Sequence, residues 1–332
     1  MLAQFAIAAK RRRRSAGSPA PTPRLIFAQP ASALSDVAGM QARQIIPGAT
    51  YMITRRCTQR QFLLVPRRRT VELVGYCLAY AIQRTGVIVH AVIFMSNHYH
   101  IVVTDPHGVL PAFVECLNKL IAKCVNASLG RWENLWASEQ ASYVRLLDAE
   151  AVIDKIAYAL SNPVQAGLVK RGEDWPGVRH ARPGSYVVRR PDVFFRDHGS
   201  MPKTVKFEIA TPSLDGLSRR DAQACIDEAV AQREATERAR ILREGGRFLG
   251  ASAVKRQDPF ESPTTREPRR QLSPRVASRN KWRRIETLAR CADFARDYRD
   301  ALAAWCAQKR SIIFPVGTYL MRLRHQVRCA EA

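Results

Sequence analysis

Two consecutive apolar segments of strand length place the strongest constraint on how this 332-residue chain can fold. The first, Val87–Met95, is the longest apolar run in the sequence, and the second, Tyr99–Thr104, begins after a short break at Ser96 and Asn97. β-type segments separated by a short turn favour an antiparallel hairpin. We therefore predict a buried hairpin within the first folded domain.

Segments of alternating helical and strand character surround the hairpin and predict an α+β domain over residues 46–190. Asp148 can cap the last of its helices, and Pro163 is expected to stop that helix. An antiparallel sheet with helices on a face accommodates this order of elements. The expected elements are, in order, a strand at Thr50–Arg56, a helix at Val71–Arg84, the two hairpin strands, a helix at Leu110–Leu129 that ends at Gly130, a strand at Ser142–Leu147 and a helix from Ala149 to about Asn162.

The two ends of the chain differ from this domain. Residues 1–45 are rich in Pro, Ala and Ser and predict a disordered basic tail, because they offer little apolar surface to bury. Residues 201–332 predict a mostly helical, basic region with a Pro- and Arg-rich linker near 259–284.

The charge of the chain favours a polyanionic partner, since 53 Lys and Arg against 29 Asp and Glu leave a net charge of +24. No apolar stretch approaches the roughly 20 residues that a membrane-spanning helix needs. The apolar start precedes its basic cluster, which is the reverse of a secretory signal. The eight cysteines form no Cys-x-x-Cys pair. We expect nucleic acid rather than a membrane as the partner, reduced thiols and a cytoplasmic location.

His98 and His100 are the sharpest candidates for chemistry. In a strand, residues two apart share a face, and two rises of about 3.3 Å let both imidazoles reach one metal ion. The alternative is a pair of strand histidines without a ligand, which is the commoner interpretation of an isolated His-x-His. A metal would also need a third ligand from elsewhere in the chain.

Tyr158 and Asn162 form a second candidate pair, because residues four apart share one face of a helix. The amide oxygen of Asn162 is a hard donor suited to Mg²⁺ or Mn²⁺, and Tyr158 offers a phenol. Taken alone, the pattern favours Tyr158 as a core aromatic and Asn162 as a helix C-cap.

Together the two pairs suit one reaction in a basic protein. A metal would polarise a DNA phosphodiester while the tyrosine oxygen attacks phosphorus. The covalent phosphotyrosine conserves the bond energy, so strands can be rejoined without ATP. A free phenol has a pKa near 10, so a neighbouring base, a water or the metal must activate it.

The motifs Asn97–Val103 (Asn-His-Tyr-His-Ile-Val-Val) and Tyr158–Val169 (Tyr-Ala-Leu-Ser-Asn-Pro-Val-Gln-Ala-Gly-Leu-Val) resemble those of the single-tyrosine HUH transposases. This family includes the IS200-like and the REP-associated tyrosine transposases, and the resemblance covers about residues 46–180. Departures include Ser96 in place of a proline and Tyr99 in place of an aliphatic residue.

The resemblance implies a ferredoxin-like fold, a divalent metal (Mg²⁺ or Mn²⁺) and cleavage of single-stranded or hairpin DNA through a 5′-phosphotyrosine. It assigns His98 and His100 to the metal pair, Tyr158 to the nucleophile and Asn162 to the third ligand. Relatives act as dimers or monomers, so a homodimer is possible. A bacterial, nucleoid-associated location follows from the same resemblance.

Basic residues outside these motifs are weaker candidates for DNA contacts. The tryptophans Trp132 and Trp136 could stack on bases, although core positions are favoured for both. Residues 266–284 could form an electrostatic clamp. The candidate arginines are Arg55, Arg56, Arg67, Arg68 and Arg69 around the first strand, and Arg283 and Arg284 in the basic segment.

A different class of function stays open at this stage. A non-catalytic nucleic-acid-binding protein on the same fold would keep the basic charge and need no metal. Within the enzymatic interpretation, the protein could be an autonomous transposase or a housekeeping enzyme acting on dispersed palindromic repeats. Covalent attachment of the protein to DNA would distinguish the enzyme from the non-catalytic binding protein.

Overall fold

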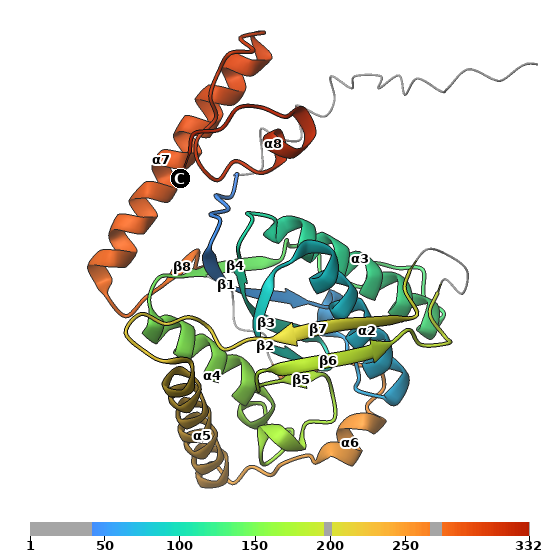
Figure 1. The fold of residues 1–332 in the computed structure, drawn as a ribbon. Helices are drawn as coiled ribbons and strands as arrows, with labels where there is room; N and C mark the ends of the chain where they lie inside the picture. Colours follow the sequence, from blue (N-terminus) through green and yellow to red (C-terminus); the bar gives the residue numbers. More distant parts are fainter. Residues whose placement is uncertain (1–41, 196–200, 266–273, 332) are drawn as a thin grey trace, which may run out of the picture. The chain divides into compact units, whose positions relative to one another are not determined.

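An eight-stranded sheet forms the centre of the computed structural model, which describes residues 42–195, 201–265 and 274–331 (Figure 1). Along the sheet the strand order is β6-β7-β2-β3-β1-β4-β8, and β5 pairs with β2. The strands are β1 (Ala49–Arg56), β2 (Ile88–Phe94), β3 (His98–Asp105), β4 (Ser142–Leu146), β5 (Arg179–His180), β6 (Gly184–Arg189), β7 (Thr204–Ile209) and β8 (Val276–Ala277).

The predicted hairpin is present as β2 and β3, which pair antiparallel with Val92 opposite Ile101. A bulge at His90 interrupts the ladder between Val89 and Ala91. The imidazole of His90 is held there by hydrogen bonds to Ala210 O and Thr104 Oγ1, at 2.7 and 2.8 Å. Both ring nitrogens therefore have partners although the side chain is buried.

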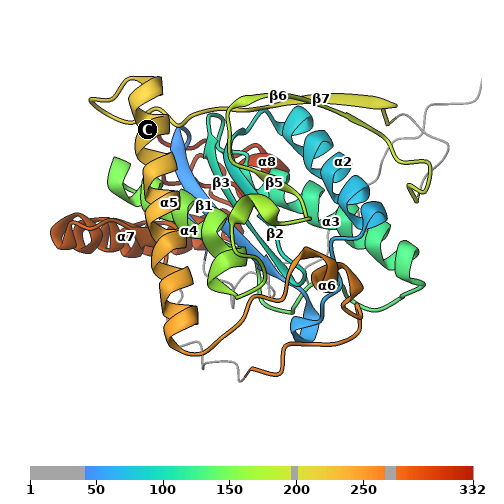
Figure 2. The same ribbon diagram turned by 90° about the horizontal axis from the view of Figure 1, so that it is seen from below.

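Helices cover both faces of the sheet (Figure 2). The helices α2 and α3 pack on one face, whereas α4 lies on the other face with α5 against it. The expected order of strands and helices from β1 to α4 is confirmed. The helices are α2 (Arg68–Thr85), α3 (Leu110–Leu129), α4 (Ala149–Gln165), α5 (Arg219–Arg243), α6 (Ala251–Arg256), α7 (Lys281–Cys306) and α8 (Leu320–His325), with short 3-10 turns η1 (Thr58–Arg60) and η2 (Gly172–Asp174).

The end of α4 differs from the prediction, because Pro163 lies inside the helix rather than stopping it. The backbone continues with Ala166 N donating to Asn162 O at 2.9 Å. Pro163 and Val164 are both buried there. Their burial offsets the one backbone hydrogen bond that the proline removes. Asn162 is consequently an interior residue of the last turn and not a cap.

The region beyond residue 190 contains the helices α5 to α8, but it also contributes two strands to the central sheet. β7 pairs with both β6 and β2, and β8 pairs with β4. The boundary placed near residue 190 therefore falls within the sheet. The strand β7 forms because Val205, Phe207 and Ile209 alternate with exposed polar residues.

The expected tail and linker are only partly within the described residues. Residues 1–41 and 266–273 lie outside them. Residues 42–45 do not continue the expected tail, because Ile45 is buried and its N–H donates to Gly317 O at 3.0 Å. A small second core beside this segment joins α7, α8 and the last residues of the chain. It consists of Phe294, Tyr298, Ala301, Phe314, Met321 and Val327.

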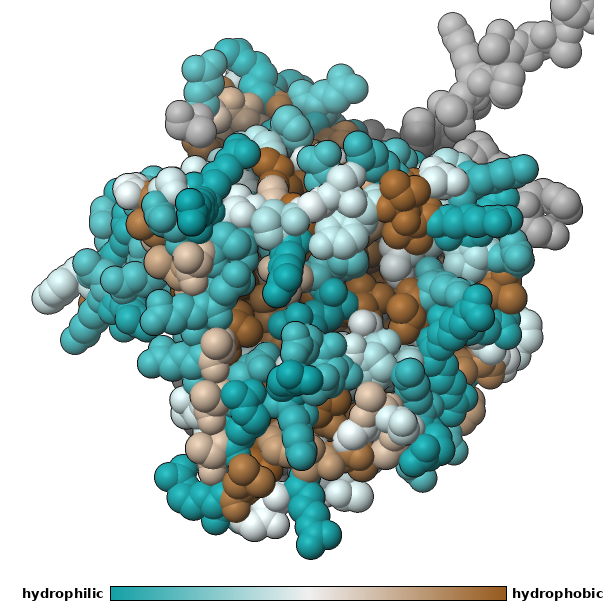
Figure 3. Space-filling view, turned by 60° about the horizontal axis from the view of Figure 1, so that its bottom comes forward, coloured by the Kyte–Doolittle hydropathy of each residue, from teal (hydrophilic) through white to brown (hydrophobic). Residues whose placement is uncertain are grey.

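The surface carries the charge of the chain. One face is largely hydrophilic, with hydrophobic residues in separate small patches (Figure 3). Within the described ranges, no helix combines the length and the apolar character that crossing a bilayer requires.

His180 on β5 provides a test of this packing, because its imidazole lies 4.5 Å from the Tyr186 ring and 5.4 Å from the Phe207 ring between centroids. Burial lowers its pKa to about 4. The unfolded chain, with an ordinary histidine pKa near 6.5, therefore binds this proton more readily than the native state. This contribution to stability is present above about pH 6.5 and is lost as the pH falls toward 4.

We expect the free energy of unfolding to fall by about 2 kcal/mol between pH 7.5 and pH 5 through His180 alone. His180→Phe keeps an aromatic ring in place and removes the titration. Urea unfolding at both pH values should show a smaller acid loss in the variant than in the wild type. Equal losses would contradict the burial of a neutral imidazole.

Candidate functional site

The two histidines of the His-x-His motif lie on the face of the sheet that α4 covers. Alternation along β3 places Val102 on the same face, in contact with α4, and turns Tyr99 toward α2 and α3. Tyr99 is fully buried there, and its hydroxyl donates to Asn118 Oδ1 at 2.8 Å. The rings of His98 and His100 are 4.8 Å apart between centroids. The predicted shared face is therefore present.

The helix α4 brings Tyr158 and Asn162 to these histidines. It begins at Asp148, whose carboxylate accepts from Ala151 N at 2.8 Å, and its apolar side packs on β1 and β3. The Tyr158 ring lies 5.3 Å from the His100 ring between centroids. Asn162 Nδ2 lies 3.4 Å from His100 Nε2. All four predicted residues thus converge on one place.

Hydrogen bonds set the protonation of His100. Its Nδ1 lies 2.8 Å from Thr54 Oγ1 on the neighbouring strand β1, and its Nε2 accepts from the Asn162 amide. The proton therefore lies on Nδ1 and the lone pair on Nε2. Burial, with a smaller contribution from His98, holds the pKa of His100 well below its usual range. The imidazole is consequently neutral at physiological pH.

His98 also has a hydrogen-bond partner at Nδ1. Its Nδ1 lies 2.7 Å from Asn97 Oδ1. The Asn97 amide nitrogen donates to Arg60 O at 3.0 Å, which turns the amide oxygen toward His98. Nδ1 of His98 is then the donor in this contact. Neither Thr54 nor Asn97 was singled out from the sequence as a partner of the histidines, although Asn97 directly precedes His98.

The residues present fit a divalent cation. Histidine binds metals as the neutral imidazole, and partners on Nδ1, which both His98 and His100 have, are typical of such sites. A rotation of the Asn162 amide about its last torsion would present its oxygen as a third donor. No group of three or more His, Cys, Asp or Glu side chains suited to a metal occurs among the described residues. The fit therefore depends on the amide.

Two cations and a buried environment surround the Tyr158 phenol. Lys155 Nζ lies 5.9 Å and the Arg233 guanidinium carbon 5.8 Å from the ring centroid. Burial raises the pKa of Tyr158, while the charge of Arg233 and a hydrogen bond with Asn162 oppose that rise. Asp154 holds both cations, at 3.0 Å from Lys155 Nζ and 2.6 Å from Arg233 Nη2. Arg233 comes from α5, so the C-terminal region contributes to the site.

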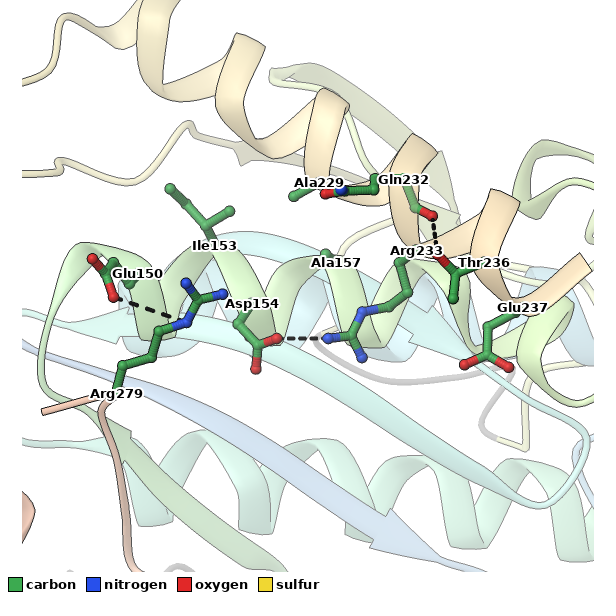
Figure 4. Close-up of a pocket in the computed structure, with 10 residues that line it drawn as sticks. All are labelled: Glu150, Ile153, Asp154, Ala157, Ala229, Gln232, Arg233, Thr236, Glu237 and Arg279. Carbon is green, nitrogen blue, oxygen red and sulfur yellow. Dashed lines mark hydrogen bonds and ion pairs between the residues drawn. The ribbon is translucent and has the colours of Figure 1, made fainter. Parts of the chain in front are cut away.

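A cavity of about 520 Å³ lies between α4 and α5 beside these residues (Figure 4). The pair Asp154–Arg233 spans it, and Arg279 reaches Glu150 from the segment after β8. The acids that line it, which include Glu237, outnumber the arginines. Because every arginine in the lining faces a carboxylate, this cavity does not favour a phosphate.

The predicted arginines differ in their surroundings. Arg69 and Arg283 are exposed, and Arg68 is exposed and pairs with Glu72 at 2.8 Å. The others are held by acceptors of this chain, which makes them structural in the free protein. Arg55 donates to Ala137 O and Glu139 O, Arg56 to Glu139, Arg67 to Lys255 O and Gln257 O, and Arg284 to Ser278 O and Arg279 O.

The two tryptophans named from the sequence have opposite environments. Trp136 packs edge-on against Tyr99, with 5.6 Å between ring centroids, and its indole donates to Asn118 O at 3.0 Å. The core position favoured for it is confirmed. Trp132 is 98% exposed, so the core position favoured for it was wrong. The loop after α3 turns this ring outward, away from apolar neighbours.

Comparison with known proteins gives solved structures only. No family model matches the chain, and no curated protein matches it. A REP-associated tyrosine transposase bound to a REP hairpin is similar with a TM-score of 0.34 and 18% identity, over 42% of this chain and 81% of that chain. A protein of Deinococcus radiodurans described as a candidate transposase gives a TM-score of 0.25 and 16% identity, over 32% and 84%.

The Thr54 hydroxyl should matter for metal affinity although it would not touch the metal. Thr54→Val removes the acceptor that fixes the His100 tautomer and keeps the shape of the side chain. We expect Mn²⁺ binding, measured by electron paramagnetic resonance, to weaken by about tenfold. Thr50→Val is the matched control, because Thr50 lies four residues earlier on β1 and bonds Thr104 rather than a histidine. Equal weakening in both variants would argue against the role of Thr54.

Proposed function

We propose that this protein is a metal-dependent, single-tyrosine DNA strand transferase of the HUH transposase type. The observation that carries the proposal is the convergence of His100, Tyr158 and Asn162, with the two rings 5.3 Å apart and the amide 3.4 Å from the imidazole. These groups come from different elements of the sheet and its covering helix. Two buried polar groups, His100 and Asn162, lie beside this half-buried phenol.

The fold supports the same proposal. The elements β1-α2-β2-β3-α3-β4 follow the ferredoxin-like order, and their strands lie in the sheet as β2-β3-β1-β4. Both helices of this unit pack on one face. The opposite face then carries His98 and His100 and is left for α4, which is how the fold places the tyrosine over the histidines.

The reaction follows from the groups at the site. The Tyr158 oxygen attacks the phosphorus of a phosphodiester as its proton passes to a base, and the bond to the 3′ oxygen breaks. The leaving 3′ oxygen takes up a proton, and the 5′ phosphate stays on Tyr158 as a phosphotyrosine. A divalent cation held by His98, His100 and Asn162 would polarise a phosphoryl oxygen and stabilise the developing charge. Attack by a 3′ hydroxyl reverses the step and transfers the strand.

The substrate that suits this site is single-stranded or hairpin DNA. The net charge of +24 favours a polyanion. The preference for hairpins rests on the resemblance of the two motifs to the transposase family.

Tyr158→Phe should abolish covalent attachment to DNA, because phenylalanine keeps the ring and removes the nucleophilic oxygen. We expect wild-type protein incubated with a labelled hairpin oligonucleotide and Mn²⁺ to form an adduct that survives denaturing electrophoresis. The variant should lose at least about a thousandfold of this activity.

Tyr80→Phe on α2 is the matched control, since it removes a hydroxyl on the opposite side of the sheet, and it should retain the adduct. Absence of an adduct from the wild type with several hairpins would favour the non-catalytic binding protein. An adduct that persists in Tyr158→Phe would move the nucleophile to another residue.

His98→Ala should separate catalysis from DNA binding. It removes one imidazole of the proposed metal pair and leaves the basic surface in place. We expect cleavage to be abolished while hairpin affinity, measured by anisotropy without metal, changes by less than about twofold. Parallel loss of binding and cleavage would instead make His98 a structural residue.

A further inference from the structure

Trp132 is unusual among the surface residues, because its indole is 98% exposed and contributes nothing to the core. The loop that carries it, between α3 and β4, is nevertheless anchored on both sides of the ring. Before the ring, Arg131 N donates to Asn126 O at 2.9 Å; after it, Glu133 O accepts from Asn126 Nδ2 at 2.7 Å. The indole is thus a large apolar side chain held outward on a fixed loop.

A second exposed ring lies beside this loop. The guanidinium of Arg131, next to Trp132 in the chain, lies 5.9 Å from the ring centroid of Phe260, which is 51% exposed. Gln61 links the two, since its side chain accepts from Arg131 Nη1 at 3.3 Å and donates to Phe260 O at 3.1 Å. Phe260 follows α6, so this surface combines the α3–β4 loop with the C-terminal region.

Hydrogen bonds connect this surface to the metal-binding strand. Arg60, one residue before Gln61, accepts through its carbonyl from Asn97, whose oxygen faces His98. The segment that carries Phe260 also reaches the turn before His98, where Ser96 Oγ donates to Gln257 Oε1 at 3.0 Å. Ser262 Oγ donates to Gln59 O at 2.8 Å, which holds the segment that carries Phe260 against η1. The exposed rings and His98 are therefore parts of one framework.

We propose that Trp132, Arg131 and Phe260 form a stacking surface that binds unpaired bases of the DNA strand next to the cleaved phosphodiester. An indole, a phenyl ring and a guanidinium are the side chains on which bases stack, and this stacking requires bases that are not already stacked in a duplex. The charge of Arg131, together with the +24 of the chain, favours a nucleic acid over an apolar protein segment. The inference rests on the proposed function for the identity of the strand.

Binding of a short single strand tests the surface directly. The full-length protein carries Tyr158→Phe to prevent covalent attachment, and its affinity for fluorescein-labelled oligothymidylate is measured by anisotropy without added metal. We expect Trp132→Ala to weaken binding by about tenfold, and Trp132→Phe, which keeps an aromatic face, to retain most of the affinity. Phe260→Ala should also weaken binding, by several fold.

The control is Leu242→Ala, because Leu242 is another large exposed apolar side chain, 64% exposed, on α5 and outside every segment proposed to contact DNA. It should change the affinity by less than about twofold. Trp132→Ala and the parent protein should bind a fully paired duplex of the same length equally well, since stacking on Trp132 needs unpaired bases. Unchanged single-strand binding by Trp132→Ala, equal losses in Trp132→Ala and Leu242→Ala, or an equal loss for the duplex would overturn the proposal.

This design separates the two proposals. Binding is measured in a variant that cannot form the adduct, so it does not depend on cleavage. A tenfold loss in Trp132→Ala together with a wild type that forms no adduct would leave the stacking surface in place and overturn the strand transferase. A robust wild-type adduct with unchanged binding by Trp132→Ala would overturn the stacking surface alone.

Discussion

The packing of α4 on the face of the sheet opposite α2 and α3 is the constraint on which the site depends. Val152, Ile156 and Leu160 of this helix pack with Met52 and Val102 of β1 and β3. That apolar contact sets the position and rotation of the helix on the sheet. Tyr158 and Asn162 of the same helix consequently face His100. Burial of these apolar side chains therefore positions polar groups that could not hold such an arrangement alone.

The polar groups at this contact remain compatible with burial because each has a partner. Thr54 and Asn162 satisfy the two nitrogens of His100, and Asn97 and Arg60 fix His98. The neutral imidazole of His100 avoids the free-energy penalty of a buried charge and keeps the lone pair that a cation would use. The same network explains why a histidine pair in a strand can be more than a structural feature.

The C-terminal region is part of the same framework rather than a separate attachment. β7 and β8 pair with strands of the central sheet, and the guanidinium carbon of Arg233 on α5 lies 5.8 Å from the centroid of the Tyr158 ring. The segment after α6 holds η1 and the turn before His98. Removal of this region would therefore expose strand edges and weaken the support of the candidate site, which gives it a role that the two motifs do not reveal.

The sequence by itself determined the elements from β1 to α4 and the pairing of site residues within each of them. A period of two put His98 and His100 on one face of a strand, a period near 3.6 put Tyr158 and Asn162 on one side of a helix, and Gly130 marked the end of α3. The strands β5 to β8 were not predicted from the sequence. Only the tertiary structure decided that the tyrosine meets the histidines, that Thr54 bonds His100, and that Arg233 lies beside the Tyr158 ring. These contacts join residues far apart in the chain, and their geometry depends on how whole helices pack on the sheet, which no local pattern encodes.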